Sequence, residues 1–191
     1  MDLKQVLLDQ LSGAAAQKLG ARNGLDTNQT GSAVDSALTA ILSGLQQNVG
    51  SKKQAKKLDE AVAKDHSGAI LEDLVGAIDS NRTASEGGKI LEHIFGRKTG
   101  TVTDKVAENA GVSTSAAGDI LATLAPIVLG QLGKTKQSGR LDAGGVADQI
   151  LRQKLPNNTI TSVVTGLLDQ NKDGQVVDDL VRMGTSLFRK K

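Results

Sequence analysis

The sequence predicts an all-α protein, folded as a compact helical bundle of two stacked, duplicated multi-helix units. Apolar residues recur at spacings of three and four along most of the chain, which places them on one face of a helix. Aromatic residues are nearly absent, since the 191 residues include two Phe and no Trp or Tyr. The core must therefore consist of Leu, Ile, Val and Ala, which suit helices that approach one another closely.

The first half of the chain predicts four helical segments. A helix over residues 1–19 is interrupted near Gly13, and a longer one over residues 29–48 follows a polar turn that is rich in capping residues. The apolar residues on one face of the longer helix are Val34, Leu38, Ile41, Leu42 and Leu45. A short helix through Leu58 and Val62 and another over residues 69–78 lead into a polar stretch at residues 79–88.

The second half predicts longer and better-defined helices. One covers residues 89–95, with Ser85 and Glu86 as its cap and first-turn acid. The next begins at Ser113 or Thr114 and runs to Leu132, and Pro126 inside it predicts a kink. The remaining helices are expected over residues 141–155, 160–168 and 176–188.

Four segments of the first half return in the second half in the same order. Residues 7–13 match 90–96, residues 24–45 match 111–132, residues 57–59 match 140–142, and residues 76–81 match 166–171. We therefore predict two helical repeats, a first and degenerate copy at residues 1–85 and a second at residues 86–191. Each repeat would cover apolar faces that the other cannot bury alone.

The second copy carries a family resemblance. ILEHIFG at residues 90–96, an alanine-rich segment ending in Gly111, and LAPIVLGQLG at residues 124–133 together resemble the YidB-like bacterial family, known as domain of unknown function 937. The resemblance is specific over residues 88–133. Thr39 replaces the proline of the motif in the first copy, which marks that copy as degenerate. The resemblance implies an all-helical bacterial protein with no assigned activity.

Composition and charge exclude several functional classes. The formal net charge is +2, so the chain has no global field that would hold nucleic acid or an anionic membrane. Without cysteine it has no disulfide, thiolate zinc site or thiol nucleophile. We expect no membrane span and no signal peptide, and a cytoplasmic location.

The strongest chemical motif is DQNKDGQVVDD at residues 169–179, which resembles the opening of an EF-hand or dockerin calcium loop. The predicted calcium ligands are Asp169, Asn171, Asp173, the backbone carbonyl of Gln175, and Asp179. Leu180 occupies the twelfth position, where a bidentate acid is normal, so weak affinity is expected. The alternative interpretation is a plain turn between two helices, in which Asp173 and Gly174 end the first.

The remaining motifs give no support for a catalytic function. His66 and His93 fall in different copies without matched partners, and the sequence favours structural roles for both. GQLGKT at residues 130–135 mimics the end of a phosphate-binding loop, but Val128 stands where the first glycine is required. A glycine-rich helix end with Lys134 near the last carbonyls is the better interpretation. We expect no catalytic residue and no cofactor other than calcium.

A basic cluster, Lys52, Lys53, Lys56 and Lys57, favours a solvated connection. Phosphate contacts would be its alternative use, but no aromatic residue is interleaved to stack a base, so nucleic-acid binding is unfavoured. The function that the sequence favours is therefore a non-enzymatic binding or scaffolding protein with a protein partner or self-association. A calcium-responsive module acting through residues 169–179 is the first alternative, and a nucleic-acid-associated protein using the lysine cluster is the second.

Overall fold

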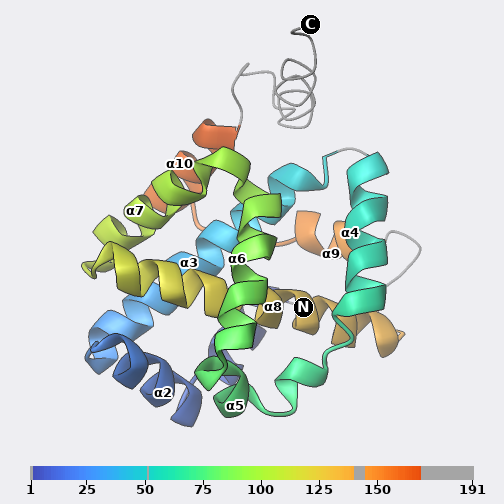
Figure 1. The fold of residues 1–191 in the computed structure, drawn as a ribbon. Coiled ribbons are helices and arrows are strands. Elements are labelled where there is room, and N and C mark those ends of the chain that lie inside the picture. Colours follow the sequence, from blue (N-terminus) through green and yellow to red (C-terminus); the bar gives the residue numbers. More distant parts are fainter. Residues whose placement is uncertain (1, 51, 140–144, 169–191) are drawn as a thin grey trace, which may run out of the picture.

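A computed structural model of the chain describes residues 2–50, 52–139 and 145–168, and within these ranges it contains helices and no strand (Figure 1). The prediction of an all-α bundle is thereby confirmed. The first six α-helices are α1 (Leu3–Gln10), α2 (Ala14–Asn23), α3 (Thr27–Asn48), α4 (Lys52–Asp65), α5 (Leu74–Asp79) and α6 (Asn81–Phe95). They are followed by α7 (Thr99–Ala110), α8 (Thr114–Gln137), α9 (Gly145–Leu151) and α10 (Thr159–Leu168), with the 3-10 turns η1 (Ala69–Leu71) and η2 (Gly96–Lys98).

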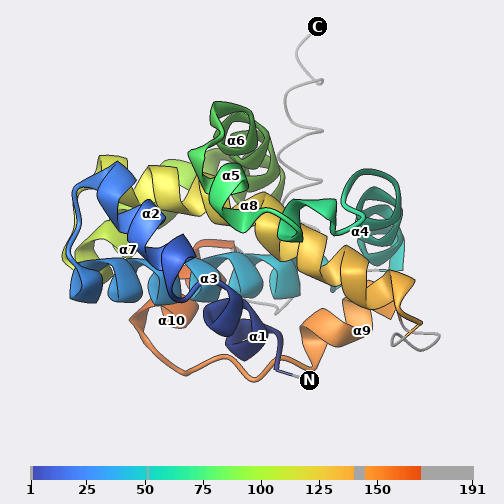
Figure 2. The same ribbon diagram turned by 90° about the horizontal axis from the view of Figure 1, so that it is seen from below.

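Two long helices, α3 and α8, form the centre of the molecule and pack against each other (Figure 2). Figure 2 shows α5 and α6 on the α8 side of this pair, α1, α9 and α10 on the α3 side, and α4 at one end. Both central helices bury almost every residue of their middle turns, including Leu38, Ile41, Leu121 and Leu124. The predicted core of aliphatic side chains is therefore shared by helices from both halves of the chain.

The starts of α3 and α8 are defined by local signals. The Asp26 side chain accepts a hydrogen bond from Gln29 N at 2.8 Å, and the Gln29 side chain accepts one from Asp26 N at 3.2 Å, a complete capping box. The Ser113 hydroxyl accepts a hydrogen bond from Ala116 N at 3.1 Å. These caps satisfy amide groups that the first turn of a helix leaves without partners, so each boundary is specified by its own residues.

The turns before these two helices also match. Gly24 and Gly111 each adopt a left-handed conformation with φ 65°, which a glycine reaches at no steric cost. Gly13 and Gly96, with φ 62° and 55°, form a second equivalent pair. Both pairs fall at aligned positions of the two sequence copies, which favours the duplication. The assignment of two repeats stays a prediction.

The start of α6 differs from the prediction. Residues 79–88 were expected to be a polar connection, but Ser80 caps a helix that begins at Asn81 and runs without a break to Phe95. The expectation was wrong because the first turns of α6 carry mainly polar and small residues, so apolar periodicity does not mark them. The predicted boundary between residues 85 and 86 thus lies inside α6.

The two halves are interleaved in space. α10, from the second half, packs on α3 and α7, while η1, from the first half, packs on α8. Arg22 in α2 joins the halves directly, because its Nη2 donates to Asp119 Oδ1 in α8 at 2.7 Å. Its Nη1 donates to the Ile78 carbonyl oxygen at 2.6 Å. The described helices therefore fold around one core.

The apolar helix α8 bears on the expectation of no membrane span, which stays a prediction. Within the described residues, α8 is long and apolar enough to cross a membrane by length and composition alone. In this fold, 83% of its most apolar 18-residue window is buried inside the protein. The apolar character of α8 is that of a helix surrounded by other helices.

Candidate ligand-binding cleft

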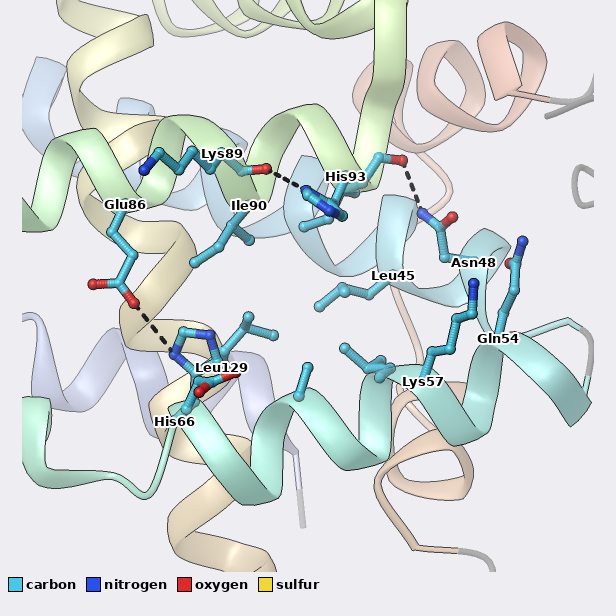
Figure 3. Close-up of a pocket in the computed structure, with 14 residues that line it drawn as sticks. Leu45, Asn48, Gln54, Lys57, His66, Glu86, Lys89, Ile90, His93 and Leu129 are labelled. Atoms are coloured by element: carbon cyan, nitrogen blue, oxygen red, sulfur yellow. Dashed lines mark hydrogen bonds and ion pairs between the residues drawn. The ribbon is translucent and has the colours of Figure 1, made fainter. Parts of the chain in front are cut away.

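A cleft of about 530 Å³ lies between α4 and α6 (Figure 3). Its volume is within the range of 300–1,000 Å³ that is usual for ligand sites. Two helical walls enclose an aliphatic floor beneath a polar rim. The cleft is lined by Leu45, Asn48, Gln54, Lys57, Leu58, Ala61, Asp65, His66, Glu86, Lys89, Ile90, His93, Ile94 and Leu129.

The α6 wall is held close to α8 by a glycine. A Cβ atom at Gly87 would overlap the backbone carbonyl of Ala122, so only glycine allows the two helices to approach this closely. The α4 wall stands apart, because Val62 is the single buried residue of that helix. α4 is attached at one edge, where Lys136 of α8 donates to Asp59 Oδ2 at 2.6 Å. The space between the walls results from these two different attachments.

The floor of the cleft is aliphatic. Leu45 comes from the end of α3 and Leu129 from α8. Leu58 of the α4 wall and Ile90 and Ile94 of the α6 wall also line the cleft. Asn48 fixes one end of the cleft, since its Nδ2 donates to the carbonyl oxygens of Gly44 at 2.9 Å and of Ile94 at 2.8 Å. An apolar group entering the cleft would therefore meet a preformed hydrophobic surface.

The rim is polar, and its charges are separated along the cleft. Lys57 lies toward the end where Asn48 ties α3 to α6, whereas Glu86 and Lys89 lie toward the other end. Asp65, which precedes His66 in the chain, adds a second carboxylate to that other end. Lys57 and Asp65 are eight residues apart in α4, which corresponds to about 12 Å along the helix axis. The cleft therefore presents a cationic end at Lys57 and, because two carboxylates outnumber the one ammonium group of Lys89, an anionic end on the other side of its aliphatic floor.

His66 is the most enclosed titratable group of the rim. Its side chain is 11% exposed, and its Nδ1 lies 3.9 Å from Glu86 Oε1. Burial lowers the pKa of His66 below 6.5 and outweighs the opposite effects of Glu86 and Asp65. The imidazole is accordingly neutral near pH 7, and the contact with Glu86 becomes an ion pair only on acidification.

His93, by contrast, is exposed, and its Nδ1 lies 2.8 Å from the carbonyl oxygen of Lys89 one turn earlier in α6. Both histidines of the chain thus line one cleft, although the sequence placed them in different copies without matched partners. No spacing along the chain signals this proximity, because it depends on how α4 folds back beside α6. The cleft could therefore not be predicted from the sequence.

The other predicted sites fall outside this cleft or have structural explanations. The calcium ligands Asp169, Asn171, Asp173, Gln175 and Asp179 lie outside the described residues. Among the residues that are described, no group of three or more His, Cys, Asp or Glu is placed to hold a metal ion. The lysine cluster was expected to be a connection, but it forms the first turns of α4, with Lys57 on the cleft.

The phosphate-loop-like sequence GQLGKT is explained by packing. It lies in the last turns of α8, which ends at Gln137, five residues beyond the expected Leu132. Lys134 is in the last turn of the helix, so the expected glycine-rich helix end is confirmed. A Cβ atom at Gly133 would overlap the carbonyl of His66, and one at Gly130 would be 2.5 Å from the Ile70 side chain. The glycines let the segment that follows α4 lie directly on α8. This close approach also positions His66 at the cleft.

The comparison with known families decides what the chain is related to. A family model described as a bacterial protein of unknown function, DUF937, matches residues 5–135. The chain belongs to the DUF937 family. No curated protein and no solved structure matches it. The DUF937 match confirms the resemblance and extends it beyond residues 88–133, because it includes most of α1, all of α2 to α7 and nearly all of α8. Every residue that lines the cleft lies within the DUF937 match.

Proposed function

We propose that this protein is a non-enzymatic binding protein whose cleft between α4 and α6 receives an amphipathic helix from a protein partner. The observation that carries the proposal is the combination of an aliphatic floor with a charged rim in a cleft of about 530 Å³. An amphipathic helix lays its apolar face into such a groove and keeps its polar face in water. Leu45, Ile90 and Leu129 would contact the apolar face of that helix.

Binding is favoured over catalysis by the arrangement of the rim. The Glu86 carboxylate lies 3.9 Å from His66, but no serine, threonine or cysteine from the described part of the chain lines the cleft as a nucleophile. His66 donates to no third group that would orient it as a general base, among the contacts of the described residues. His93 is occupied by a local contact with its own helix. Apolar burial and charge pairing are the two interactions that these residues supply best.

The experiment fills the cleft with a side chain. Ala61 lines the cleft, and Ala63, two residues along α4, is exposed and does not line it. Ala61→Trp should weaken binding of the apolar dye 1-anilinonaphthalene-8-sulfonate by about tenfold, whereas Ala63→Trp should leave it unchanged. Dye fluorescence is measured by titration of the full-length protein, with circular dichroism to verify that each variant is folded.

The same two variants then test whether a protein partner binds in the cleft. The parent and Ala63→Trp proteins should retain the same host protein on an affinity column, and Ala61→Trp should lose it. Equal dye affinity in all three proteins, together with equal retention by all three, would show that the cleft is not the binding site.

A further inference from the structure

We propose that the resident occupant of the cleft is the chain's own C-terminal segment, residues 176–188, which a partner helix must displace. This inference rests on the proposed function, because one cleft serves both helices. Three independent observations support it: the apolar pattern of the segment, the point at which the chain leaves α10, and the distribution of charge along the cleft.

The sequence of the segment predicts an amphipathic helix of the required size. Five of its seven apolar residues recur at the spacing of one helix face, and these are Val177, Leu180, Val181, Leu187 and Phe188. Thirteen helical residues extend about 20 Å, close to the length of the 14-residue α4 that forms one wall. Phe188 is one of only two phenylalanines in the chain, and the other, Phe95, is fully buried. A phenylalanine in the segment is well suited to the aliphatic floor.

The chain leaves the described fold beside the cleft. The Gln47 side chain in α3 donates to Thr165 Oγ1 in α10 at 3.5 Å, and Gln47 is adjacent to Asn48 at the cationic end of the cleft. Leu168, the last residue of α10, is one turn beyond Thr165. Figure 1 shows α10 ending at the same side of the molecule as the end of α3 and the C-terminus of α6. The seven residues 169–175 can span up to roughly 23 Å, which reaches the cleft from this point.

Charge along the segment matches charge along the cleft. Starting from Leu168, the segment first presents Asp178 and Asp179, then Arg182, and is followed by the basic residues 189–191. The cleft presents Lys57 near the exit point and, at the far end, Asp65 and Glu86 with the single cation Lys89. A helix that runs away from the exit therefore places its acids near the lysine and its basic tail near the carboxylates. The reverse direction would bring like charges together.

Disulfide trapping tests the contact in the full-length chain, which contains no native cysteine. Ala61→Cys is combined with Leu180→Cys in one variant and with Leu187→Cys in another. Matched controls carry Ala63→Cys in place of Ala61→Cys. Under mild oxidation in the presence of a chelator, intramolecular cross-links should form about tenfold faster with the cysteine at 61 than at 63, because docking raises the effective concentration.

Charge reversal tests the direction of docking. Asp178→Lys with Asp179→Lys should slow the cross-link by about fivefold, and Lys57→Glu added to that variant should restore it. The same double reversal should increase dye affinity of the cleft, since the competing segment is weakened. Circular dichroism of each variant verifies that the fold is retained.

The outcomes separate this inference from the proposed function. Equal cross-linking rates for cysteines at 61 and 63 would overturn the docking of residues 176–188, while the dye titration would still decide whether the cleft binds ligands. Cross-links that form only between two chains would assign the occupant to a second copy and also overturn the inference. If the cysteine at 61 cross-links selectively but the cleft takes up no dye, even after charge reversal, the docking of residues 176–188 is upheld. The proposed function is then wrong.

Discussion

Gly87 of α6 lies directly against the backbone carbonyl of Ala122 in α8, at a distance that excludes a Cβ atom. This contact brings the two helices together along one side of the cleft, so that Ile90 and Ile94 of α6 reach its floor. A Cβ atom added to the neighbouring Gly88 would have no atom within 4 Å, although Gly88 belongs to the same helix. Two adjacent glycines therefore have opposite roles.

The substitutions Gly87→Ala and Gly88→Ala should change stability in opposite directions. Gly87→Ala forces α6 away from α8, and we expect it to lower the free energy of unfolding by about 1–3 kcal/mol. Gly88→Ala adds a methyl group in open space and reduces the entropy of the unfolded chain, so a gain of about 0.5–1 kcal/mol is expected. Urea unfolding followed by circular dichroism measures both. A destabilised Gly88→Ala protein would contradict the assignment.

The pair Arg22 and Asp119 should be energetically coupled. The two side chains are 20% and 25% exposed, and Asn23 Nδ2 adds a second hydrogen bond to Asp119 Oδ2 at 3.0 Å. A double-mutant cycle with Arg22→Met and Asp119→Asn should give a coupling energy of about 1–2 kcal/mol, because the pair is shielded from water.

The exposed pair Lys105 and Glu108 in α7 provides the control for that cycle. Lys105 Nζ lies 2.6 Å from Glu108 Oε2, but the two side chains are 42% and 70% exposed. The coupling energy there should not exceed about 0.5 kcal/mol. Similar coupling energies in the two cycles would mean that burial does not strengthen the Arg22 pair.

Stability should depend on pH through His66. Because burial lowers the pKa of His66 in the folded state below 6.5, the unfolded chain binds more protons between the two pKa values. The stabilising contribution is therefore complete above pH 6.5 and is lost as the pH falls below 6.5 toward the folded pKa. His66→Gln should flatten this part of the stability profile.

The measurement is urea unfolding at a series of pH values from about 7.5 to 5, a range that brackets the ordinary pKa of histidine. His93→Gln is the matched control, because the exposed His93 lines the same cleft. A parent protein that becomes more stable on acidification through this range would show that Glu86 and Asp65 outweigh the burial of His66.

The calcium prediction for residues 169–179 can be tested by thermal unfolding. Calcium that binds the folded chain should stabilise it by about 2.7 kcal/mol when the free ion is at a hundred times Kd. With Leu180 in place of the twelfth-position acid, we expect a Kd of about 10⁻⁴–10⁻³ M. The melting temperature should rise in millimolar calcium relative to chelator, and Asp173→Ala should abolish the rise. The same melting temperature in both conditions for the parent would identify the loop as an ordinary turn.

Local signals in the sequence were sufficient to predict most of the helices and the family of the protein. The apolar stripe of α3, the cap at Ser113 and the break at Gly13 each depend on residues within one or two turns of each other. These features could be predicted because a helix is specified by short-range hydrogen bonds and by periodic burial of one face. The start of α6 was missed because its polar first turns lack that periodicity, although Ser80 provides a cap.

The residues that line the cleft come together only in the tertiary structure. His66 and His93 share it because Gly133 lets the segment after α4 rest on α8, while Gly87 holds α6 against another part of the same helix. A glycine needed for close approach looks the same in a sequence as one that faces open space, as Gly87 and Gly88 show. The sequence by itself determined most of the helices and which of their faces are apolar. The relative placement of helices distant in the chain, and with it the site, depends on steric fit between surfaces that no local pattern encodes.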